Sequence, residues 1–599
     1  MITRVQPSLL ATAAFALLGS SCGISEPELP PYLEFSEPVL DLGLEREGQI
    51  EIRNTGGQSI GPIELVPGEI RDLSGSMVPG SRLSLDPAEI PTLNPGDKRL
   101  LTLQLSLDGS LNSGEYDTWV RARGGGCALC CRTNQCREVN ALLSVRFTVL
   151  SELEAAVTSV RIVAPPFDPR TGDVINLPLE ARDEAGTLLQ GVPVYWSVNP
   201  SQAGYVGKNG QFVGYQTGEA SIIAQAGTIA DTLALNVLDR NIEGSFSVAL
   251  IGREVGRYTS DLWLHGDVLY SGTWGTRQTG SHSSFGNTLN VWDISVPGTT
   301  FRSIQRSFSI EIDARVVNDV KVRTDGELAI ITHEGSNDAL NGITILDLDN
   351  PLEPTVVSRF TAELESGVHN VWIEGDYAYL VVDGVGNGLR ILNISDPENP
   401  SVIARFWAGK SFLHDVYVRG GLAFLSHWNA GLVILDVGNG IADGSPENPV
   451  EVSRLSDLGG QTHNAWYWPE AGYVFVGEED FDSPGIMHVV DLRNLLEPRE
   501  VATFKVPGQT PHNFWLDEST GTLYLAWYGN GVRALDVTGD LLGELDRQGR
   551  EIAGLVYNGG SGTCNRGSGD TCTWAPQFHR GLVWVSDMNE GLVGLEPPR

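Results

Sequence analysis

Basic residues and methionine are scarce in this chain of 599 residues. It holds 40 Lys and Arg against 75 Asp and Glu, a formal net charge of −35, and only 4 Met. The phosphates of nucleic acid and anionic membrane surfaces would repel so acidic a protein, which argues against both as partners. Long Ala/Glu/Lys/Leu tracts are missing as well, whereas there are 70 Gly, 32 Pro and 14 Trp. This composition excludes a helical protein and favours short strands joined by turns.

Long apolar runs are also absent, apart from a short one near the N-terminus. The run from Leu9 to Leu18 follows Arg4 and precedes Gly19-Ser20-Ser21-Cys22, an order typical of a signal peptide. About ten residues are too few to span a bilayer, which needs about 20. We therefore interpret residues 1–22 as an export signal and the Pro- and Glu-rich residues 23–35 as a linker. No later segment is long and apolar enough to be transmembrane.

Cys22 directly follows the small residues of this signal. It resembles the lipidated cysteine of the lipobox of bacterial lipoproteins, although Gly19 stands where the lipobox has an aliphatic residue. The resemblance implies an exported lipoprotein of the cell envelope, at the outer membrane or cell surface. The protein would then touch the membrane only through this N-terminal lipid anchor. Ordinary cleavage without lipidation is the alternative.

The other six cysteines lie in two local groups. The even number and the exported context predict disulfides, within the set Cys127, Cys130, Cys131, Cys136, Cys564 and Cys572. The first group follows Gly124-Gly125-Gly126, which looks like the tip of a hairpin. Four thiolates so close together could instead hold zinc in a tetrahedral site, so this alternative stays open.

Two β-domains are expected before residue 241. Residues 36–150 contain short segments of alternating apolar and polar residues, such as Leu143–Val149, divided by turns, a pattern typical of a β-sandwich. Residues 155–240 include "GVPVYWSV" with Trp196 as the core aromatic. Both segments resemble bacterial Ig-like domains, the second more closely. The resemblance implies a spacer or adhesive stalk, and neither segment shows a His, Asp or Ser cluster that would carry chemistry.

Residues 244–599 contain a repeat. One phrase recurs at intervals of 45 to 58 residues and starts at Ser260, Asn318, His369, His414, His463 and His512. Each copy is followed by a turn, a second strand, a Gly, a third strand ending in Asp or Asn, and usually a fourth strand. Four short strands every 45–60 residues predict the blades of a β-propeller.

The third strands carry a further similarity. Gly342–Asp347, Gly388–Pro397 and Gly431–Val437 resemble the LVIVD repeat of bacterial surface propellers. The resemblance implies a closed β-propeller but no particular reaction. A seventh unit starts at Trp574 and has only three strands, so Phe246–Ile251 is expected to supply its fourth. The expected fold is all-β: a seven-bladed propeller preceded by two Ig-like β-sandwiches.

The repeated phrase also predicts a site. It lies at the entry to the first strand of each blade, which lines the central channel, so its histidines should converge on one mouth. The ends of the second strands should lie beside them. We therefore predict a ligand-binding set formed by His369, His414, His463, His512, His333, His427, Asp383 and Glu478. The second residue of each phrase is Asp or Asn, and we interpret it as architectural, bonding turn amides. A structural role for the histidines stays open.

The residue types of this set are compatible with metal binding and with the binding of an organic ligand. Imidazoles with a carboxylate suit zinc, copper or iron, and His414, His463 and His512 are the candidate metal ligands. The acidic run Glu478–Asp482 could bind calcium, but it lacks the spacing of a known calcium loop. The chain has no H-E-x-x-H, G-x-S-x-G or P-loop motif, and no catalytic residue can be named. We therefore favour a module that binds an extracellular protein, polysaccharide or small ligand. A metal-dependent oxidoreductase or hydrolase is the alternative, and a purely structural envelope protein is the third.

Overall fold

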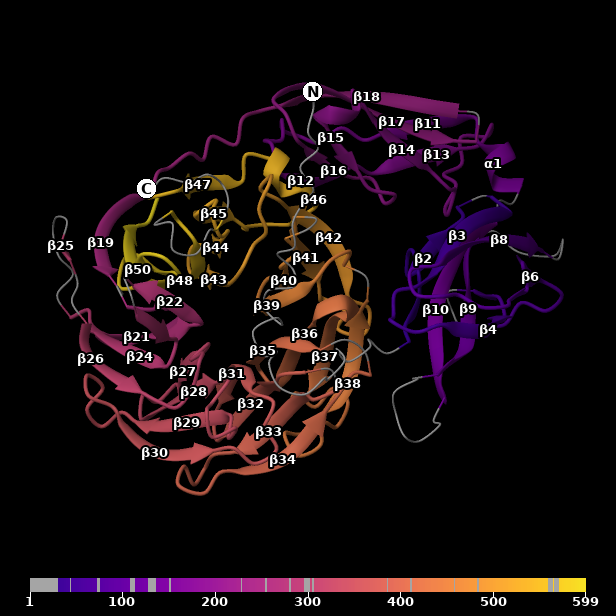
Figure 1. Ribbon diagram of the computed structural model, residues 1–599. Coiled ribbons are helices and arrows are strands. Elements are labelled where there is room, and N and C mark those ends of the chain that lie inside the picture. The colour runs from indigo at the N-terminus through magenta and orange to yellow at the C-terminus, as the bar shows by residue number, and fades with distance from the viewer. Residues whose placement is uncertain are drawn as a thin grey trace, which may run out of the picture. The chain divides into compact units, whose positions relative to one another are not determined.

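The computed structural model describes residues 31–598, and its regular structure is almost entirely β (Figure 1). Short gaps in the described residues lie at 44, 73–75, 108–113, 128–135, 150–151, 228, 254–255, 280–281, 296–301, 304–305, 385, 410–411, 457, 482–483, 559–563 and 565–569. The predicted signal peptide, Cys22, Cys130 and Cys131 lie outside the described residues. The chain divides into two compact units, residues 1–151 and 152–599. Within the described part, no helix has the length and apolar character needed to cross a membrane.

The first unit consists of two sheets around one core. One sheet has the order β1-β3-β8-β6, and the other has the order β2-β10-β9-β4-β7 with β5 paired to β9. Alternating side chains of the two sheets, including Ile52, Leu103 and Phe147, are buried in the shared core, as the alternating sequence predicts. The strands are β1 (Leu33–Phe35), β2 (Val39–Asp41), β3 (Glu47–Asn54), β4 (Ile60–Pro67), β5 (Arg71–Asp72), β6 (Arg82–Asp86), β7 (Glu89–Ile90), β8 (Lys98–Ser106), β9 (Gly114–Cys127) and β10 (Cys136–Val149).

Two details of this unit bear on the sequence predictions. Strand β1 pairs with β3, with Leu33 opposite Asn54. Residues 33–35 therefore belong to the first domain and not to the linker. The prolines that precede them do not prevent these three residues from forming an edge strand. Cys127 and Cys136 lie opposite each other at the ends of β9 and β10, which confirms the predicted hairpin.

The second unit begins with α1 (Glu152–Ala156) and three small sheets. Their orders are β11-β13, β12-β16-β15 and β14-β17-β18, and their core contains Phe212 and Ile222 with Trp196 packed against it. The elements are β11 (Ser159–Ile162), β12 (Val174–Asn176), β13 (Leu179–Arg182), β14 (Tyr195–Asn199), β15 (Gly204–Val206), β16 (Gln211–Gly214), β17 (Gly218–Ala226) and β18 (Ile229–Val237). Trp196 therefore packs at the core, as predicted.

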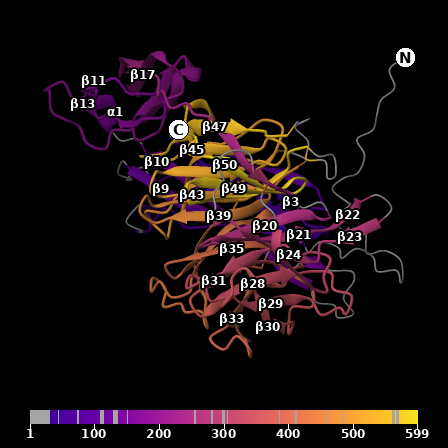
Figure 2. The same cartoon turned by 90° about the vertical axis from the view of Figure 1, so that its left-hand side faces the viewer.

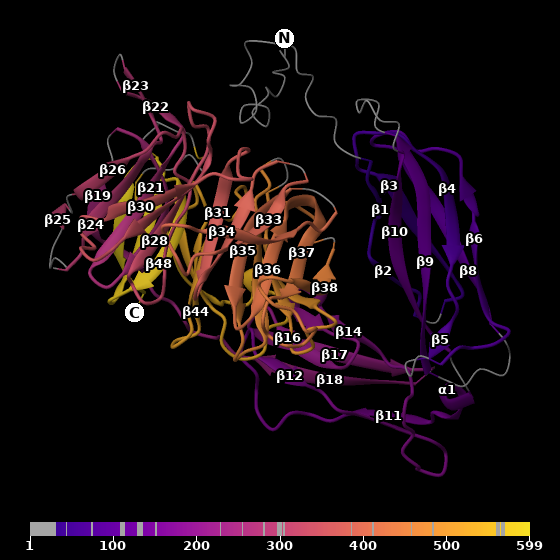
Figure 3. The same ribbon diagram turned by 90° about the horizontal axis from the view of Figure 1, so that it is seen from below.

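A β-propeller follows. Seven sheets of four or five strands, described between residues 247 and 596, are arranged around a centre (Figures 1 and 3), and all their pairings are antiparallel except those of the short β25 and β46. Their innermost strands contact one another in the order β20, β27, β31, β35, β39, β43, β48, and β48 contacts β20. The ring of innermost strands is therefore closed.

The strands of the propeller sheets follow chain order from the centre outward. The first three sheets are β20 (Tyr258–His265), β21 (Val268–Trp274), β24 (Thr288–Asp293), β26 (Arg306–Glu311); β27 (Val320–Val322), β28 (Leu328–His333), β29 (Gly342–Asp347), β30 (Thr355–Phe360); and β31 (Val368–Glu374), β32 (Tyr377–Val382), β33 (Gly388–Asn393), β34 (Ser401–Phe406). The next three are β35 (Leu413–Arg419), β36 (Leu422–His427), β37 (Gly431–Asp436), β38 (Val450–Leu455); β39 (Thr462–Trp468), β40 (Tyr473–Glu478), β41 (Met487–Asp491), β42 (Arg499–Phe504), β46 (Gly543–Glu544); and β43 (Phe514–Asp517), β44 (Thr522–Ala526), β45 (Val532–Asp536), β47 (Glu551–Leu555). A separate hairpin, β22 (Thr276–Thr279) and β23 (His282–Phe285), projects next to β21 (Figure 2).

The second and third strands of these sheets are apolar without alternation because both of their faces are covered. Every residue of β36 and of β40 is buried, since neighbouring sheets pack on both sides. A short continuous apolar run bounded by turns is what such a strand requires. The propeller core is accordingly a series of apolar layers between adjacent sheets.

The last sheet joins the two ends of the propeller. It contains β48 (Thr573–His579), β49 (Leu582–Asp587), β50 (Gly591–Glu596), β19 (Ser247–Arg253) and β25 (Arg302–Ser303). β49 and β50 lie side by side in Figure 2, and β19 pairs antiparallel with β50 from Ser247 opposite Glu596 to Arg253 opposite Gly591. This pairing confirms the prediction that Phe246–Ile251 supplies the fourth strand, and it covers an edge that would otherwise be open to aggregation.

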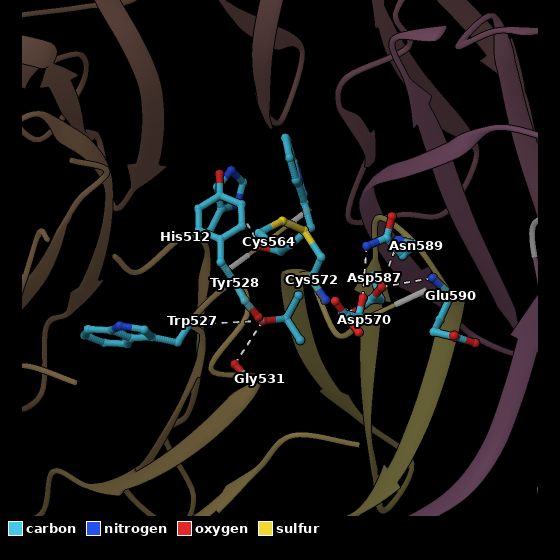
Figure 4. Close-up of a disulfide and its surroundings, with 12 residues drawn as sticks. His512, Trp527, Tyr528, Gly531, Cys564, Asp570, Cys572, Asp587, Asn589 and Glu590 are labelled. Atoms are coloured by element: carbon cyan, nitrogen blue, oxygen red, sulfur yellow. Dashed lines mark hydrogen bonds between the residues drawn. A yellow bond between two sulfur atoms is a disulfide. The ribbon is translucent and has the colours of Figure 1, made fainter. Parts of the chain in front are cut away.

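Cys564 and Cys572 form a disulfide, as predicted, and Figure 4 shows it close to Tyr528. The two cysteines are only 8 residues apart in the sequence, so the bond closes a small loop. Replacing both cysteines with serine should therefore lower the free energy of unfolding by only about 2–3 kcal/mol, from the loop entropy of the unfolded chain. Chemical denaturation of the two proteins measures this difference. Mass spectrometry that finds both thiols free in exported protein would contradict the bond.

Candidate ligand site at the mouth of the propeller channel

The first residue of each repeated phrase lies where the innermost strand is irregular. In five sheets the pairing with the second strand shifts at this residue, for example between Leu413 and Asp415 or between Thr462 and Asn464. In the other two the strand begins two residues later, at Val320 and Phe514. A β-bulge of this kind re-aims a side chain that would otherwise alternate with its neighbours. We call the seven residues at this position the mouth ring: Ser260, Asn318, His369, His414, His463, His512 and Trp574.

The four histidines of the mouth ring form a row of touching rings. The ring centroids are 4.6 Å apart for His369 and His414, 4.2 Å for His414 and His463, and 4.2 Å for His463 and His512. The row ends on Trp574, 4.1 Å from His512. The predicted convergence of the four histidines is therefore confirmed as geometry. That they bind a ligand stays a prediction.

A second circle of side chains, the outer ring, adjoins the mouth ring at the ends of the second strands. Its members are Trp274, Glu334, Asp383, Trp428, Glu479, Tyr528 and Met588. Their contacts with the mouth ring include Glu334 with His369, Trp428 with His414 at 4.9 Å between centroids, and Glu479 with His463.

Three predicted site residues belong to neither ring, and each directly precedes a member of the outer ring. His333 contacts Thr344 in its own sheet, and Glu478 pairs with His488, whereas Glu334 and Glu479 reach the mouth. His427 is likewise buried in β36, and Trp428 takes the expected place.

The physical reason is the alternation of side chains along a strand, by which a shift of one residue reverses the face. Asp383 lies with Glu334 and His369 at the mouth, as expected, and its role in ligand binding stays a prediction. The ends of the second strands were expected beside the mouth, but the predicted ligand-binding set did not include Glu334, Trp428, Glu479 and Tyr528, which those ends supply. Their common signal was their place just beyond the second strand.

One side of the mouth is acidic and carries a positive charge between two carboxyl groups. Glu334 Oε1 lies 2.9 Å from His369 Nδ1, and Asp383 completes the group. Burial opposes a charge on His369, but the hydrogen bond and charge of Glu334 raise its pKa to about 9. Burial and the Glu334 charge raise the pKa of Asp383 to about 8. At neutral pH this side of the mouth therefore holds the imidazolium of His369 next to the carboxyl groups of Glu334 and Asp383.

The other three imidazoles are neutral. His414 Nδ1 donates to the carbonyl of His463 at 3.1 Å, and His512 Nδ1 donates to the carbonyl of Trp574 at 2.7 Å. Because a carbonyl only accepts, the lone pair of each ring is on Nε2. Burial, and then the nearby His369 charge, hold the pKa values of His414 and His512 down, that of His512 at about 3. Burial and neighbouring imidazoles likewise lower the pKa of His463.

His463 is unlike its neighbours. It is 1% exposed, yet neither ring nitrogen has a hydrogen-bond partner among the described residues. The nearest acidic atom is Glu479 Oε2, 3.6 Å from Nε2. Glu479 Oε1 accepts a hydrogen bond from Tyr528, and burial raises the pKa of Glu479 to about 7. Leaving a buried polar group unpaired costs about 1–3 kcal/mol, so the fold alone gives no reason to keep an imidazole here.

The second residues of the phrases form a polar ring that ties the sheets together. Asn370 donates to Asp415 at 2.9 Å and accepts from Asn318 of the mouth ring, and Asn513 donates to Asp261 at 3.1 Å. Asp261 and Asp415 also accept from the amides of the following residues. These bonds confirm the predicted architectural role, with bonds both to backbone amides and between sheets.

One cation lies in this polar ring. The ammonium of Lys321 contacts Asp319 and lies 3.7 Å from Asp261. Burial opposes its charge, but the two carboxylates raise its pKa. Burial raises the pKa of Asp261 and of Asp415 to about 7. Lys321 therefore offsets a buried excess of acidic groups.

Aromatic side chains fill the channel further along the same strands. Trp372 packs on Tyr417 and Trp466 packs on Trp515, and both contacts join neighbouring sheets. Trp263 also touches both Trp372 and Trp515, which belong to sheets that are not its neighbours. These contacts cross the channel.

Two groups in the described residues could hold a metal ion. One is Glu334, His369 and Asp383, and the other is His414, His463 and Glu479. His512, a candidate ligand from the sequence, adjoins the second group through its ring contact with His463. The predicted calcium alternative gains no support, because Glu478 and Glu479 turn to different partners. Asp482 lies outside the described residues.

The closed circle of sheets and its polar mouth define the class of this protein as a β-propeller. Residues 367–407 and 413–455 match the model of the LVIVD repeat. These stretches contain Gly388–Pro397 and Gly431–Val437, for which the sequence suggested that resemblance, whereas Gly342–Asp347 lies outside them. Among solved structures, the chain is similar to the β-propeller domain of Cps50 (Swd1) from Myceliophteria thermophila, with 11% identity and a TM-score of 0.41 over 58% of this chain and 98% of that one. The chain matches no curated protein.

Proposed function

We propose that this protein is an exported binding protein whose seven-bladed propeller engages its ligand at the mouth ring. In this account residues 1–22 direct export, Cys22 carries a lipid anchor at the cell envelope, and the two preceding domains are Ig-like spacers. The bond between Cys564 and Cys572 supports an oxidising compartment. The match to the LVIVD repeat supports a propeller of the bacterial surface type.

The single observation that carries the binding role is His463. A side chain that is buried without a hydrogen bond lowers stability, and such costs are concentrated at functional sites. The surroundings agree with this, because repeats that serve only as scaffold stay alike, whereas the mouth ring contains four His, one Ser, one Asn and one Trp. The acidic side is accessible, since the side chains of His369 and Glu334 are 20% and 22% exposed. Trp274 and Trp428 add half-buried aromatic surface.

The ligand class follows from these groups. Carboxyl groups, an imidazolium and flat aromatic faces gathered at one place suit a polar organic ligand, such as the end of a polysaccharide or a peptide segment. Glycans are the first class to test. A metal-dependent oxidoreductase or hydrolase remains the second candidate function, and the group formed by His414, His463 and Glu479 is the observation that favours it.

Replacement of His463 by leucine should abolish ligand binding without a loss of stability. Leucine has a similar volume and no polar atoms, so the free energy of unfolding should stay equal or rise by about 1–2 kcal/mol as an unpaired polar group is removed. Glycan-array binding and thermal unfolding, measured on both proteins, give the two readouts.

The matched control is Asn370→Ala, which should keep glycan binding in folded protein and lose about 1–3 kcal/mol of stability. Its amide donates to Asp415 and to the carbonyl of His414, and these partners would be left unpaired. Undiminished glycan binding by the His463→Leu variant, or by one in which His414, His463 and His512 are all alanine, would place the site elsewhere.

A further inference from the structure

We propose that His414, His463 and Glu479 bind a divalent transition-metal ion at the mouth of the propeller. The proposal rests on the proposed function, since it names the first component that the mouth binds. The three side chains come from two neighbouring sheets: His414 from β35, His463 from β39 and Glu479 from the residue after β40.

The ligand atoms are already close together. One nitrogen of each imidazole and one carboxylate oxygen of Glu479 lie within 4.8 Å of one another. His463 Nε2 and Glu479 Oε2 are 3.6 Å apart, with side-chain exposures of 2% and 13%. Ligands bound tetrahedrally at about 2.0–2.1 Å from an ion are about 3.3 Å apart. Small side-chain rotations are therefore enough to close the site, and His463 has no other described partner to give up.

The surrounding bonds hold the ligands in the form that a metal requires. His414 donates its Nδ1 proton to the carbonyl of His463, which leaves the Nε2 lone pair available. Tyr528 donates to Glu479 Oε1, which leaves Oε2 facing His463. Metal-binding histidines and carboxylates commonly have such outer partners, which fix the tautomer and the orientation of the ligand.

The donor set selects the class of ion. Two imidazoles and one carboxylate suit Zn²⁺ and Fe²⁺ and their first-row neighbours, whereas Ca²⁺ and Mg²⁺ prefer oxygen ligands and Cu⁺ prefers sulfur. Three protein ligands leave at least one coordination position for water or for a donor atom of the ligand. The mouth can therefore bind an organic ligand through the ion.

The acidic group of the mouth is less suited to this role. His369 Nδ1 is engaged by Glu334 at 2.9 Å, and the pair is satisfied without an ion. The group around His369 is thus a hydrogen-bonded charge, whereas the group around His463 contains an unpaired imidazole.

The test is a titration of the full-length protein with Co²⁺ alone, after removal of bound metal with a chelator. We expect one Co²⁺ per chain with visible d–d absorption bands, displaced by Zn²⁺. Glu479→Gln and His463→Leu should each weaken binding at least tenfold. Glu478→Gln is the matched control: it removes the same charge one residue earlier from a side chain that faces His488, and it should bind Co²⁺ like the wild type.

Absence of stoichiometric Co²⁺ binding, or equal affinity in the wild type and the Glu479→Gln variant, would overturn the metal site. Thermal unfolding of each variant establishes that it is folded before titration. Because the titration needs no organic ligand, its failure is distinguishable from failure of the proposed function. Glycan binding that disappears in the His463→Leu variant would still support the mouth as a ligand site in protein that binds no metal.

Discussion

Deletion of residues 244–252 is expected to destabilise the propeller far more than any other short deletion outside the blade cores. This segment contains all of β19 except Arg253, and β19 pairs along its length with β50. It buries Leu250 at 3% exposure and Phe246 at 7%, each worth about 1.5–3 kcal/mol of hydrophobic free energy. Its loss also leaves the backbone groups of β50 unpaired at an open edge. The melting temperature should fall steeply and the protein should tend to aggregate.

Differential scanning calorimetry of the deletion variant measures this effect. The control is a chain without residues 1–151, the first compact unit, in which the propeller transition should keep its temperature. A propeller that melts at the same temperature with and without residues 244–252 would contradict closure by this strand.

Replacement of Lys321 by methionine should lower the free energy of unfolding by about 3–5 kcal/mol at pH 8. Methionine keeps much of the length of the side chain but leaves Asp319 and Asp261 without their cation. Removing one partner of a buried ion pair is costly in this range, because the remaining charge stays buried.

The pH dependence gives this prediction a signature. Asp261 and Asp415 already have pKa values raised to about 7, so the folded protein binds their protons more tightly than the unfolded chain, where a carboxyl titrates near 4. Stability therefore falls as pH rises from about 4 to about 7. Loss of Lys321 strengthens this trend, so the difference between variant and wild type should be smallest near pH 5 and largest above pH 7. Urea denaturation at both pH values measures it, and a difference independent of pH would contradict the role assigned to Lys321.

The fold was predictable from the sequence where the repeat was regular. Counting strands in each repeat left the last unit one strand short, which identified β19 as its partner. The histidines converged as predicted because they share one position of the phrase. The residues of the outer ring were harder to predict, since strand ends are uncertain by a residue and the wrong choice selects the opposite face. His333 and Glu478 were chosen in place of Glu334 and Glu479 for this reason.

The remaining features depend on contacts that a sequence does not show. The bulges at His414 and His463 arise from the pairing of two strands. Trp263 contacts Trp372 and Trp515, which belong to sheets far from its own in the chain. Its place in the channel could therefore be recognised only in the folded, closed ring of sheets. Lys321 was exceptional in the sequence, because the other five phrases have an aromatic residue at its position. Its acidic neighbours Asp319, Asp261 and Asp415 belong to three different sheets, so the sequence did not show that they surround it.

The most direct test of the metal site proposed at the mouth is the anomalous scattering of crystals of the full-length protein grown with Zn²⁺ and measured on both sides of the zinc absorption edge. The account predicts one strong peak per chain between His414 Nε2, His463 and Glu479 Oε2, and no such peak in the Glu479→Gln variant. A wild-type crystal without a peak at these residues, or with its zinc held at the Glu334, His369 and Asp383 group instead, would contradict it.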